Sequence, residues 1–305
     1  MKAKYWLDTD IGNDTDDYYA LAYLLARPEV ELLGISTVTA AAELRVRLVG
    51  LALGAAGKGI PVFGGAEAPF RRTDGIPCRF PTPEGSIAPV SVYDTLAREL
   101  SEPLAPAAGD AVEAMRSAIE ANPHEVTLVA IGPLANVAYL FTKYPHTAGL
   151  LRRLVLMGGC FASEMPPPWS TVEWNIRMDP YAAAAVFAAP VPECIVAGLE
   201  ETSRYECESA RFADATEGAR LTAPNVPAVR GWGRLVRFHD VVPLLPLFEP
   251  CGTRLMRGRV SVLLEGEDLG RTLFTPDEAG RVLRVFGGDV DAFFVHLADL
   301  FGYEW

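Results

Sequence analysis

Short apolar runs alternate along this chain with longer segments of helical composition. The apolar runs that we interpret as strands cover residues 5–7, 30–38, 60–63, 125–131, 151–157, 193–198, 259–264 and 281–286. The helical segments cover residues 18–27, 42–56, 110–120, 180–188 and 289–301, and a further helix follows the turn at 132–136. Strands that alternate with helices favour parallel pairing through right-handed crossovers. The pattern therefore predicts an α/β fold, with an open, mostly parallel sheet flanked by helices.

The remaining segments have no clear period. Residues 66–91 and 162–172 are rich in Pro or Gly and are predicted to be long loops, which in compact domains are often functional. Residues 203–250 are helical in patches. Because the chain shows no internal repeat and no linker, we expect residues 1–305 to form a single domain.

Composition and charge exclude several classes of function. The chain has 305 residues, half of them hydrophobic, with a net charge of -12 and a pI of about 4.9. A nucleic-acid-binding protein needs a basic face, so nucleic acid is not expected as a partner. No signal peptide opens the chain and no apolar run has membrane-spanning length. We therefore expect no membrane association.

The cysteines favour a reducing compartment. The five of them are scattered and form no C-x-x-C pair: Cys78, Cys160, Cys194, Cys207 and Cys251. An odd, unpaired set is typical neither of a disulfide framework nor of a zinc site. The expected location is the cytoplasm.

The most informative feature is a cluster of acids directly after the first predicted strand. It contains Asp8, Asp10, Asp14, Asp16 and Asp17. Carboxylates this close repel one another, and near a buried strand they require a cation or raised pKa values. Hard oxygen ligands suit Ca²⁺ or Mg²⁺ rather than zinc. The cluster predicts a metal site at the carboxyl end of the strand, although a solvated acidic loop is the simpler alternative.

Three further segments carry candidate chemistry. They are the turn Ile131-Gly-Pro133, the segment Glu173-Trp-Asn175 and the dipeptide His239-Asp240. In a parallel sheet the turn at residues 131–133 would lie at the same edge as the acid cluster, and loops could bring the other two segments there.

Two motif interpretations of the acid cluster fit poorly. An EF-hand that begins at Asp8 would need Asp or Asn where Gly12 stands and Glu where Tyr19 stands. A phosphatase of the haloacid dehalogenase type also opens with a strand and D-x-D. That family has Thr or Val at the position of Gly12, so it remains only as an alternative.

Five ordered motifs resemble the nucleoside hydrolase family of the inosine–uridine-preferring type. Asp8-Thr-Asp-Ile-Gly-Asn-Asp-Thr-Asp-Asp17 is similar to its D-x-D-x-G-x…D-D signature, with two residues more than the shortest form. The other four motifs are Thr127-Leu-Val-Ala-Ile-Gly-Pro-Leu-Ala-Asn136, Val155-Leu-Met-Gly-Gly159, Glu173-Trp-Asn-Ile-Arg-Met-Asp-Pro180 and His239-Asp240.

The resemblance implies a Ca²⁺-dependent hydrolase of the N-glycosidic bond, with its active site at the carboxyl ends of the strands. The implied metal ligands are Asp10, Asp17, Asp240 and the carbonyl of Ile131, with Asp8 as a supporting acid behind them. Asp10 would also be the general base for the attacking water, and His239 would protonate the departing base. The substrate-binding residues that we expect are Asp16, Glu173, Asn175, Trp174 and Met157. Trp169 and Trp232 are further candidates to stack on a nucleobase.

The same resemblance predicts a small nucleoside-like substrate and a homo-oligomer, either a dimer or a tetramer. Departures from the family concern the sugar-binding positions. Ala41 stands where the family has an Asn, residues 74–86 lack the usual histidine, and prolines occupy 166–168. These changes leave two alternatives to the hydrolase open: a relative that binds metal and ligand without turnover, and a Mg²⁺-dependent phosphohydrolase.

Overall fold

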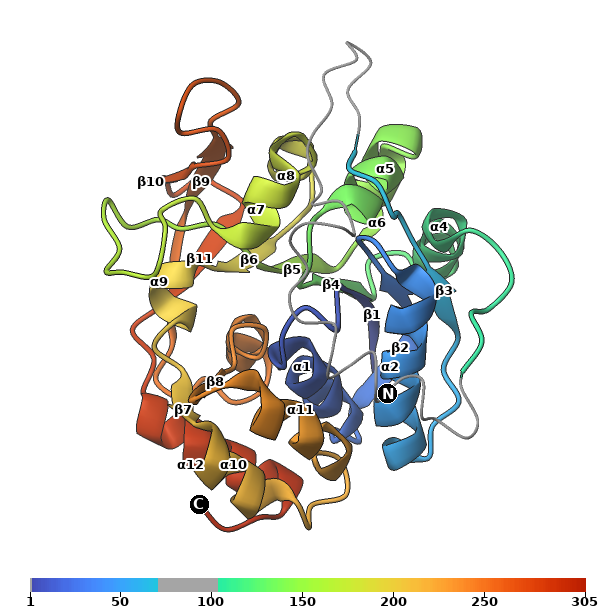
Figure 1. The fold of residues 1–305 in the computed structure, drawn as a ribbon. Helices are drawn as coiled ribbons and strands as arrows, with labels where there is room; N and C mark the ends of the chain where they lie inside the picture. Colours follow the sequence, from blue (N-terminus) through green and yellow to red (C-terminus); the bar gives the residue numbers. More distant parts are fainter. Residues whose placement is uncertain (1, 71–103) are drawn as a thin grey trace.

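The structure is a computed structural model that describes residues 2–70 and 104–305, and a nine-stranded sheet crosses its middle (Figure 1). The sheet has the spatial order β10-β9-β11-β6-β5-β4-β1-β2-β3. Its strands are β1 (Ala3–Thr9), β2 (Val30–Thr37), β3 (Val62–Gly64), β4 (Val126–Ala130), β5 (Arg153–Met157), β6 (Cys194–Ala197), β9 (Arg254–Val262), β10 (Thr272–Pro276) and β11 (Val282–Phe286). Every pairing from β3 across to β11 is parallel, and β9 and β10 join through antiparallel pairs. The predicted open, mostly parallel sheet is confirmed.

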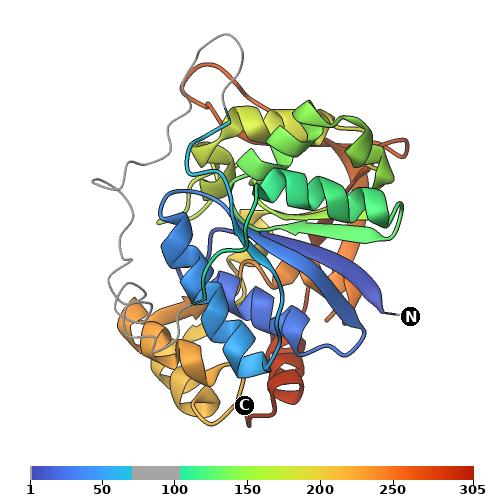
Figure 2. The same ribbon diagram turned by 90° about the vertical axis from the view of Figure 1, so that its right-hand side faces the viewer.

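Helices cover both faces of this sheet, as Figures 1 and 2 show. The helices are α1 (Asp16–Leu25), α2 (Ala42–Ala56), α4 (Ala111–Ala121), α5 (Ala135–Lys143), α6 (His146–Leu150), α7 (Trp174–Met178), α8 (Pro180–Ala188), α9 (Leu199–Thr202), α10 (Ser209–Thr216), α11 (Val226–Trp232) and α12 (Val290–Phe301), with short 3₁₀ helices η1 (Ala223–Asn225) and η2 (Val242–Leu247). The bounds of α2 and α8 are those predicted from the sequence. Helix α1 begins at the predicted acidic pair Asp16–Asp17.

Alternate residues of the central strands pack into two separate hydrophobic cores, one on each face of the sheet. In β1, Tyr5 and Leu7 pack into the core shared with α1, α2 and α12, whereas Trp6 packs into the core shared with α4, α5 and α8. In β4, Val129 joins the first core and Leu128 the second. Strands that are apolar on both faces are typical of a parallel sheet covered by helices on both sides.

The strand order changes direction between β1 and β4. From β1 the chain builds outward through β2 to β3, and it then returns to place β4 on the other side of β1. Open α/β sheets bind ligands at the carboxyl ends of the strands beside such a switch point. The loop after β1 and the turn after β4 both flank it, so the topology brings the acid cluster and Ile131 together.

A small second sheet positions the dipeptide His239–Asp240. Strands β7 (Glu206–Glu208) and β8 (Leu235–Arg237) pair in antiparallel fashion, and the dipeptide follows β8 directly. The 3₁₀ helix η2 comes next and packs against β5 and β6. This anchoring keeps a segment far along the chain close to the central strands.

The structure differs from the predicted elements in the second half of the chain. The segment 203–250 contains β7 and β8 as well as helices, and the strand predicted at 259–264 covers Arg254–Val262. Strand β10 was not predicted, because it is a short edge strand that ends in proline and pairs only with β9. Of the predicted loop at 66–91, residues 71–91 lie outside the described part of the chain.

None of the helices in residues 2–70 and 104–305 combines the length and the apolar character that crossing a membrane requires.

The contact between Trp6 and Gly34 gives a test of the packing across β1 and β2. A Cβ at Gly34 would lie 2.5 Å from the Trp6 ring, so Gly34→Ala overpacks the core. We expect this change to lower the free energy of unfolding by about 1–3 kcal/mol. Urea denaturation gives the measurement.

The matched control is Gly54→Ala in α2, where an added Cβ meets no atom of the described residues within 4 Å. Alanine favours a helix over glycine by up to about 1 kcal/mol, so this variant should be as stable as the parent or more stable. Equal destabilisation of the two variants would contradict the packing of Trp6 on Gly34.

Candidate active site

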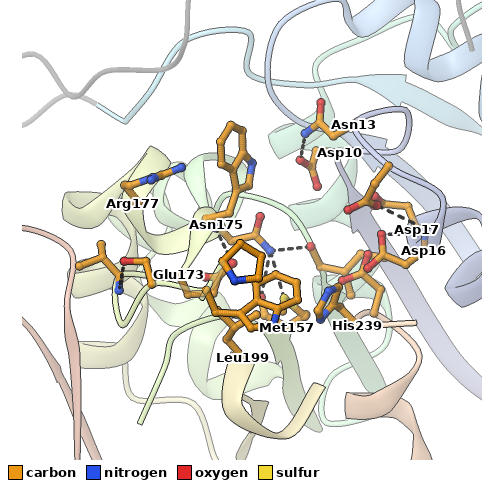
Figure 3. A pocket seen from close by; sticks show the side chains of 18 residues that line it. Asp10, Asn13, Asp16, Asp17, Met157, Glu173, Asn175, Arg177, Leu199 and His239 are labelled. Atoms are coloured by element: carbon orange, nitrogen blue, oxygen red, sulfur yellow. Dashed lines mark hydrogen bonds between the residues drawn. The ribbon is translucent and has the colours of Figure 1, made fainter. Parts of the chain in front are cut away.

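One cavity of about 350 Å³ gathers all the predicted metal ligands, both predicted catalytic residues and the five predicted substrate-binding residues. It lies at the carboxyl ends of the central strands, and its lining residues point into it from several elements (Figure 3). The predicted residues in its wall are Asp10, Asp16, Asp17, Ile131, Met157, Glu173, Trp174, Asn175, His239 and Asp240. Trp169 also lines it, whereas Trp232 does not.

A buried arginine of α2 holds the loop that follows β1. The Arg45 side chain is 3% exposed and donates through Nη1 to the carbonyls of Asp10 and Ile11, the latter at 2.9 Å. Its Nε donates to the Ala40 carbonyl at 2.9 Å, and its Nη2 donates to Asn13 Oδ1 at 2.9 Å. Asn13 in turn donates through Nδ2 to Asp10 Oδ2. Arg45 therefore fixes both the backbone of the loop and, through Asn13, the carboxylate of Asp10.

The charge of Arg45 also influences the acids beside it. Burial raises the pKa of Asp10 to about 6, and the guanidinium of Arg45 limits that rise. Burial likewise raises the pKa of Asp17 well above its ordinary value, with the charges of Asp10 and Asp14 adding to the effect. Thr9 donates its hydroxyl to Asp17 Oδ1 and so favours the ionised form.

Asp8 lies behind the cavity as the predicted supporting acid. It accepts from Ser36 Oγ at 2.5 Å and from Asn136 Nδ2 at 2.7 Å, and it is fully buried. Burial raises its pKa to about 7, although both donors act in the opposite direction. Its second oxygen, Oδ2, is buried and has no hydrogen-bond partner in the part of the chain that the structure describes. An unpartnered buried carboxylate oxygen is costly, so it fits a position next to a positive charge.

Three acids of the loop come close enough to share a cation. Asp14, Asp16 and Asp17 each offer a ligand atom, and these atoms lie within 4.8 Å of one another. Asp14, a member of the predicted acid cluster, lines the cavity. Asp240 faces the same group from the far end of the chain, and its pKa is raised by burial first and then by the charges of Asp17, Asp14 and Asp10. The acids from the two segments therefore influence one another electrostatically.

The turn after β4 passes very close to the acid loop. A Cβ at Gly132 would lie 2.7 Å from Asp10 Oδ1 and 2.9 Å from the Asp10 backbone nitrogen, so only glycine fits there. The carbonyl of Ile131 lines the cavity and accepts from Asn175 Nδ2 at 2.8 Å. A carbonyl oxygen has two lone pairs, so this bond leaves one for a cation.

Glu173 and Asn175 are held by backbone groups at the start of α7. Glu173 accepts from the backbone nitrogens of Asn175 at 2.7 Å, Gly159 at 2.9 Å and Ile176 at 3.2 Å, and it thereby caps the helix. Burial raises its pKa to about 7. Asn175 donates to the Met157 carbonyl at 3.2 Å as well as to Ile131. The two predicted substrate ligands therefore also tie α7 to the ends of β4 and β5.

His239 is more deeply buried than its predicted role assumes. Its Nδ1 lies 2.8 Å from Thr202 Oγ1, and its ring meets Trp169 edge-to-face with centroids 5.4 Å apart. Burial first, and then the charge of Arg237, lower the pKa of His239 to about 3. The imidazole is therefore neutral at pH 7, whereas we assumed an ordinary pKa near neutrality.

Sequence reasoning gave no functional role to three residues of this site. Asn13 carried only a turn signal, and Arg45 lies within a helical segment that resembles an ordinary core helix. Arg177 lines the cavity from α7. The one available signal for Arg45 was its charge within the largely apolar segment 42–56, which Glu43 and Arg47 share.

The positions that depart from the family pattern have distinct geometries. Ala41 precedes α2 with a φ of 68° and Thr39 has a φ of 72°, both in the left-handed region that favours glycine. Ala41 is not among the residues that line the cavity, whereas Pro168 is. The changed positions therefore affect the cavity unequally.

The sequence is similar to known proteins along most of its length. The model of the inosine-uridine preferring nucleoside hydrolase family matches residues 5–294. The chain is 31% identical over 313 residues to the non-specific ribonucleoside hydrolase RihC of Salmonella typhi, with 97% of each chain covered. It is 35% identical over 206 residues to RihC of Klebsiella pneumoniae (strain 342), which covers 67% of this chain and 64% of that protein.

Solved structures share the fold at lower identity. A plant nucleoside hydrolase, the PpNRh1 enzyme, superposes with a TM-score of 0.78 at 20% identity and 99% coverage of both chains. The inosine-uridine preferring nucleoside hydrolase from Bacillus anthracis gives a TM-score of 0.77 at 22% identity, covering 98% of this chain and 99% of that one.

The bonds of Arg45 predict that Arg45→Met disorders the acid loop. Four acceptors lose their donor in this variant, so we expect the free energy of unfolding to fall by about 2–5 kcal/mol. We also expect at least about 10-fold weaker binding of Ca²⁺, because the loop acids are no longer fixed. Urea denaturation and isothermal titration calorimetry measure the two effects.

Arg47→Met on the same helix is the control, since among the described residues Arg47 pairs with Glu43 one turn away, and Glu43 is exposed. It should change stability by no more than about 0.5 kcal/mol. Similar losses in the two variants would refute a special role for Arg45.

The buried carboxyls predict an unusual pH dependence when no cation is bound. The pKa values of Asp8 and Glu173 are raised to about 7, above those in the unfolded chain. The folded state then binds these protons more tightly, so stability falls as the pH rises from roughly 4 towards 7. In EDTA we expect a higher melting temperature at pH 6 than at pH 8. Excess Ca²⁺ should reduce the difference, because a cation stabilises ionised acids; equal melting temperatures in EDTA would contradict this assignment.

Proposed function

The chain belongs to the inosine-uridine preferring nucleoside hydrolase family, and from this premise we propose that it hydrolyses the N-glycosidic bond of a nucleoside or related ribosyl compound with the help of one Ca²⁺ ion. The observation that carries the proposal is the convergence of the acid loop, the Ile131 turn and His239–Asp240 on one cavity. It makes the chain an N-glycosyl hydrolase whose site lies at the switch point of the sheet.

The donor set fits a hard divalent cation. Asp10, Asp17, Asp240 and the Ile131 carbonyl offer only oxygen atoms, which suit Ca²⁺, and Asp14 and Asp16 stand next to them. The raised pKa values of Asp17 and Asp240 also support a cation, because their ionised forms need a compensating charge. When bound, Ca²⁺ would hold the sugar hydroxyls and lower the pKa of the attacking water.

Asp10 is the proposed general base. Its carboxylate faces the cavity while Asn13 holds one of its oxygens, so the other stays available to accept a proton from water. Its pKa of about 6 lies close to neutral pH, where a general base is most effective. The water would attack the anomeric carbon as the C–N bond breaks, through an oxocarbenium-like state similar to that of glycoside hydrolysis.

His239 is the proposed proton donor to the departing base. Its low pKa means that it does not carry the proton in the resting protein. A leaving base that gains negative charge nearby would raise the pKa of the imidazole, so His239 would take a proton from solvent and pass it to the base, returning to the neutral form. Thr202 fixes the ring through Nδ1, which directs Nε2 away from this contact.

The remaining wall residues are proposed to bind the substrate. Asp16, Glu173 and Asn175 would hydrogen-bond the sugar hydroxyls, with Met157 and Trp174 packing against the substrate. Because Ala41 and the prolines at 166–168 offer no polar side chain, we expect weak discrimination among sugar analogues and low kcat/KM for plain inosine and uridine.

The comparisons do not favour the two alternatives. A Mg²⁺-dependent phosphohydrolase does not explain a family match over residues 5–294. A relative that has lost turnover does not explain why Asp10 and His239 both line the cavity. The wall of the cavity is that of an enzyme.

Assembly, compartment and domain structure are further proposals. We propose a single domain that forms a dimer or tetramer and acts in the cytosol. The cysteines among the described residues are free, as is usual in a reducing compartment. Leu255 and Leu273 are exposed on the outer strands β9 and β10, where a second subunit could cover them.

Release of free base from a panel of nucleosides tests the function directly. The assay compares the protein with added Ca²⁺, with added Mg²⁺ and in EDTA, and includes a generic phosphate ester. We expect base release that depends on Ca²⁺ and no release of phosphate. Hydrolysis of the phosphate ester with Mg²⁺ alone would establish the phosphohydrolase instead.

The role of Asp10 predicts the outcome of Asp10→Asn. An amide cannot accept the proton of water, so we expect kcat to fall by at least about 10²–10⁴-fold. Metal content must be measured on the same sample, because Asp10 is also a proposed ligand. Near-parental activity in this variant would rule out Asp10 as the base.

A further inference from the structure

The cavity wall carries several acids, most of them on the loop that follows β1, and one basic side chain on α7 among the described residues. Arg177 is the only lysine or arginine among the described residues that line it, beside the acids Asp10, Asp14, Asp16, Asp17, Glu173 and Asp240. Figure 3 shows Arg177 across the cavity from Asp16, Asp17 and His239. The side of the cavity on α7 therefore differs in charge from the side that faces the acid loop.

Arg177 is held in place without an ion pair in the described part of the chain. Its guanidinium carbon lies 5.1 Å from the centre of the Trp174 ring. Its backbone packs against Gly270, where an added Cβ would lie 3.3 Å from the Arg177 Cα. Arg237 differs from Arg177 in this respect. Its guanidinium carbon also lies over a tryptophan of the wall, 4.9 Å from the centre of the Trp169 ring, but its Nε donates to Glu206 at 2.9 Å. The stack on Trp174 orients the guanidinium and leaves its N–H donors for a ligand.

We propose that Arg177, stacked on Trp174, is a subsite for an oxyanion carried by the nucleoside substrate. A guanidinium binds carboxylate or phosphate oxygens through paired N–H donors. A wall of carboxylates repels an anionic substrate, so a cation on the opposite side determines whether such a substrate can enter. The preferred substrates are therefore ribosyl compounds that carry a carboxylate or a phosphate.

The inference rests on the proposed function and specifies its substrate class. With the sugar hydroxyls at the acid loop, both the base and the 5′ carbon extend away from it. The oxyanion can accordingly belong to the base or to the 5′ position. The chemistry of recognition is the same in both cases, and the choice of compounds distinguishes them.

Uridine and two of its acidic analogues provide the test. Orotidine carries a carboxylate on the base, and uridine 5′-carboxylate carries one on the sugar. We expect wild-type kcat/KM to favour one of them over uridine. In Arg177→Met the ratio of acidic to neutral kcat/KM should fall by about 10–100-fold, as expected for a charge-assisted hydrogen bond, and mainly through KM. Arg177→Lys keeps the positive charge but lacks the paired N–H donors of the guanidinium. Its ratio of acidic to neutral kcat/KM should therefore lie between those of the wild type and Arg177→Met.

Arg152→Ala is the control, because Arg152 is exposed at the amino end of β5, away from the cavity. Its ratio should equal that of the wild type. Calorimetric binding of each acidic analogue in Ca²⁺ gives a readout that does not depend on turnover, so a protein without hydrolase activity still tests the subsite. Equal affinity of wild type and Arg177→Met for both analogues would overturn the proposal, whatever the activity.

Discussion

The site depends on one constraint: several carboxyl groups must stay close together at the end of a buried strand. Such groups repel one another and lose their hydration when they are buried. Arg45 is the positive charge that the fold supplies against this repulsion, because its guanidinium bonds to the carbonyls of Asp10 and Ile11 from inside the molecule. Burial disfavours the charge of Arg45 as well, and the carboxylates of Asp10 and Asp17 oppose that effect. The arginine and the acids therefore stabilise one another.

The topology of the sheet explains why Arg45 can reach the loop. Strand β2 pairs in parallel with β1, so helix α2 starts at the same edge of the sheet where β1 ends. The switch point places β4 on the other side of β1, where Gly132 lets the backbone approach Asp10 closely. Asn175 then links the ends of β4 and β5 through the carbonyls of Ile131 and Met157. The bonds of Arg45, the close approach of Gly132 and the bonds of Asn175 together order the loop and the strand ends that form this part of the cavity.

Much of this was predictable from the sequence, for identifiable reasons. The acid loop and the apolar strands are local patterns, so their positions at the edge of a parallel sheet followed from periodicity. Arg45 was not predictable, because its contacts arise only when α2 packs beside the loop. The pKa of His239 could not be foreseen either, since it depends on burial and on Arg237 from the small second sheet. Short edge strands such as β10 have too few residues to give a period.

The two ends of the cavity differ in how freely their side chains can change. Asp10 is tied to Arg45 and Asn13, and Asp8 to Ser36 and Asn136, so a substitution there disturbs several bonds at once. Within residues 2–70 and 104–305, the Arg177 side chain stacks on Trp174 and donates no hydrogen bond, so its replacement there leaves no acceptor without a donor. A change on α7 can therefore alter what the cavity accepts without displacing the acids. Under the functions proposed for these residues, the tightly bonded end of the cavity carries the chemistry, and the α7 end, with fewer bonds, selects the substrate.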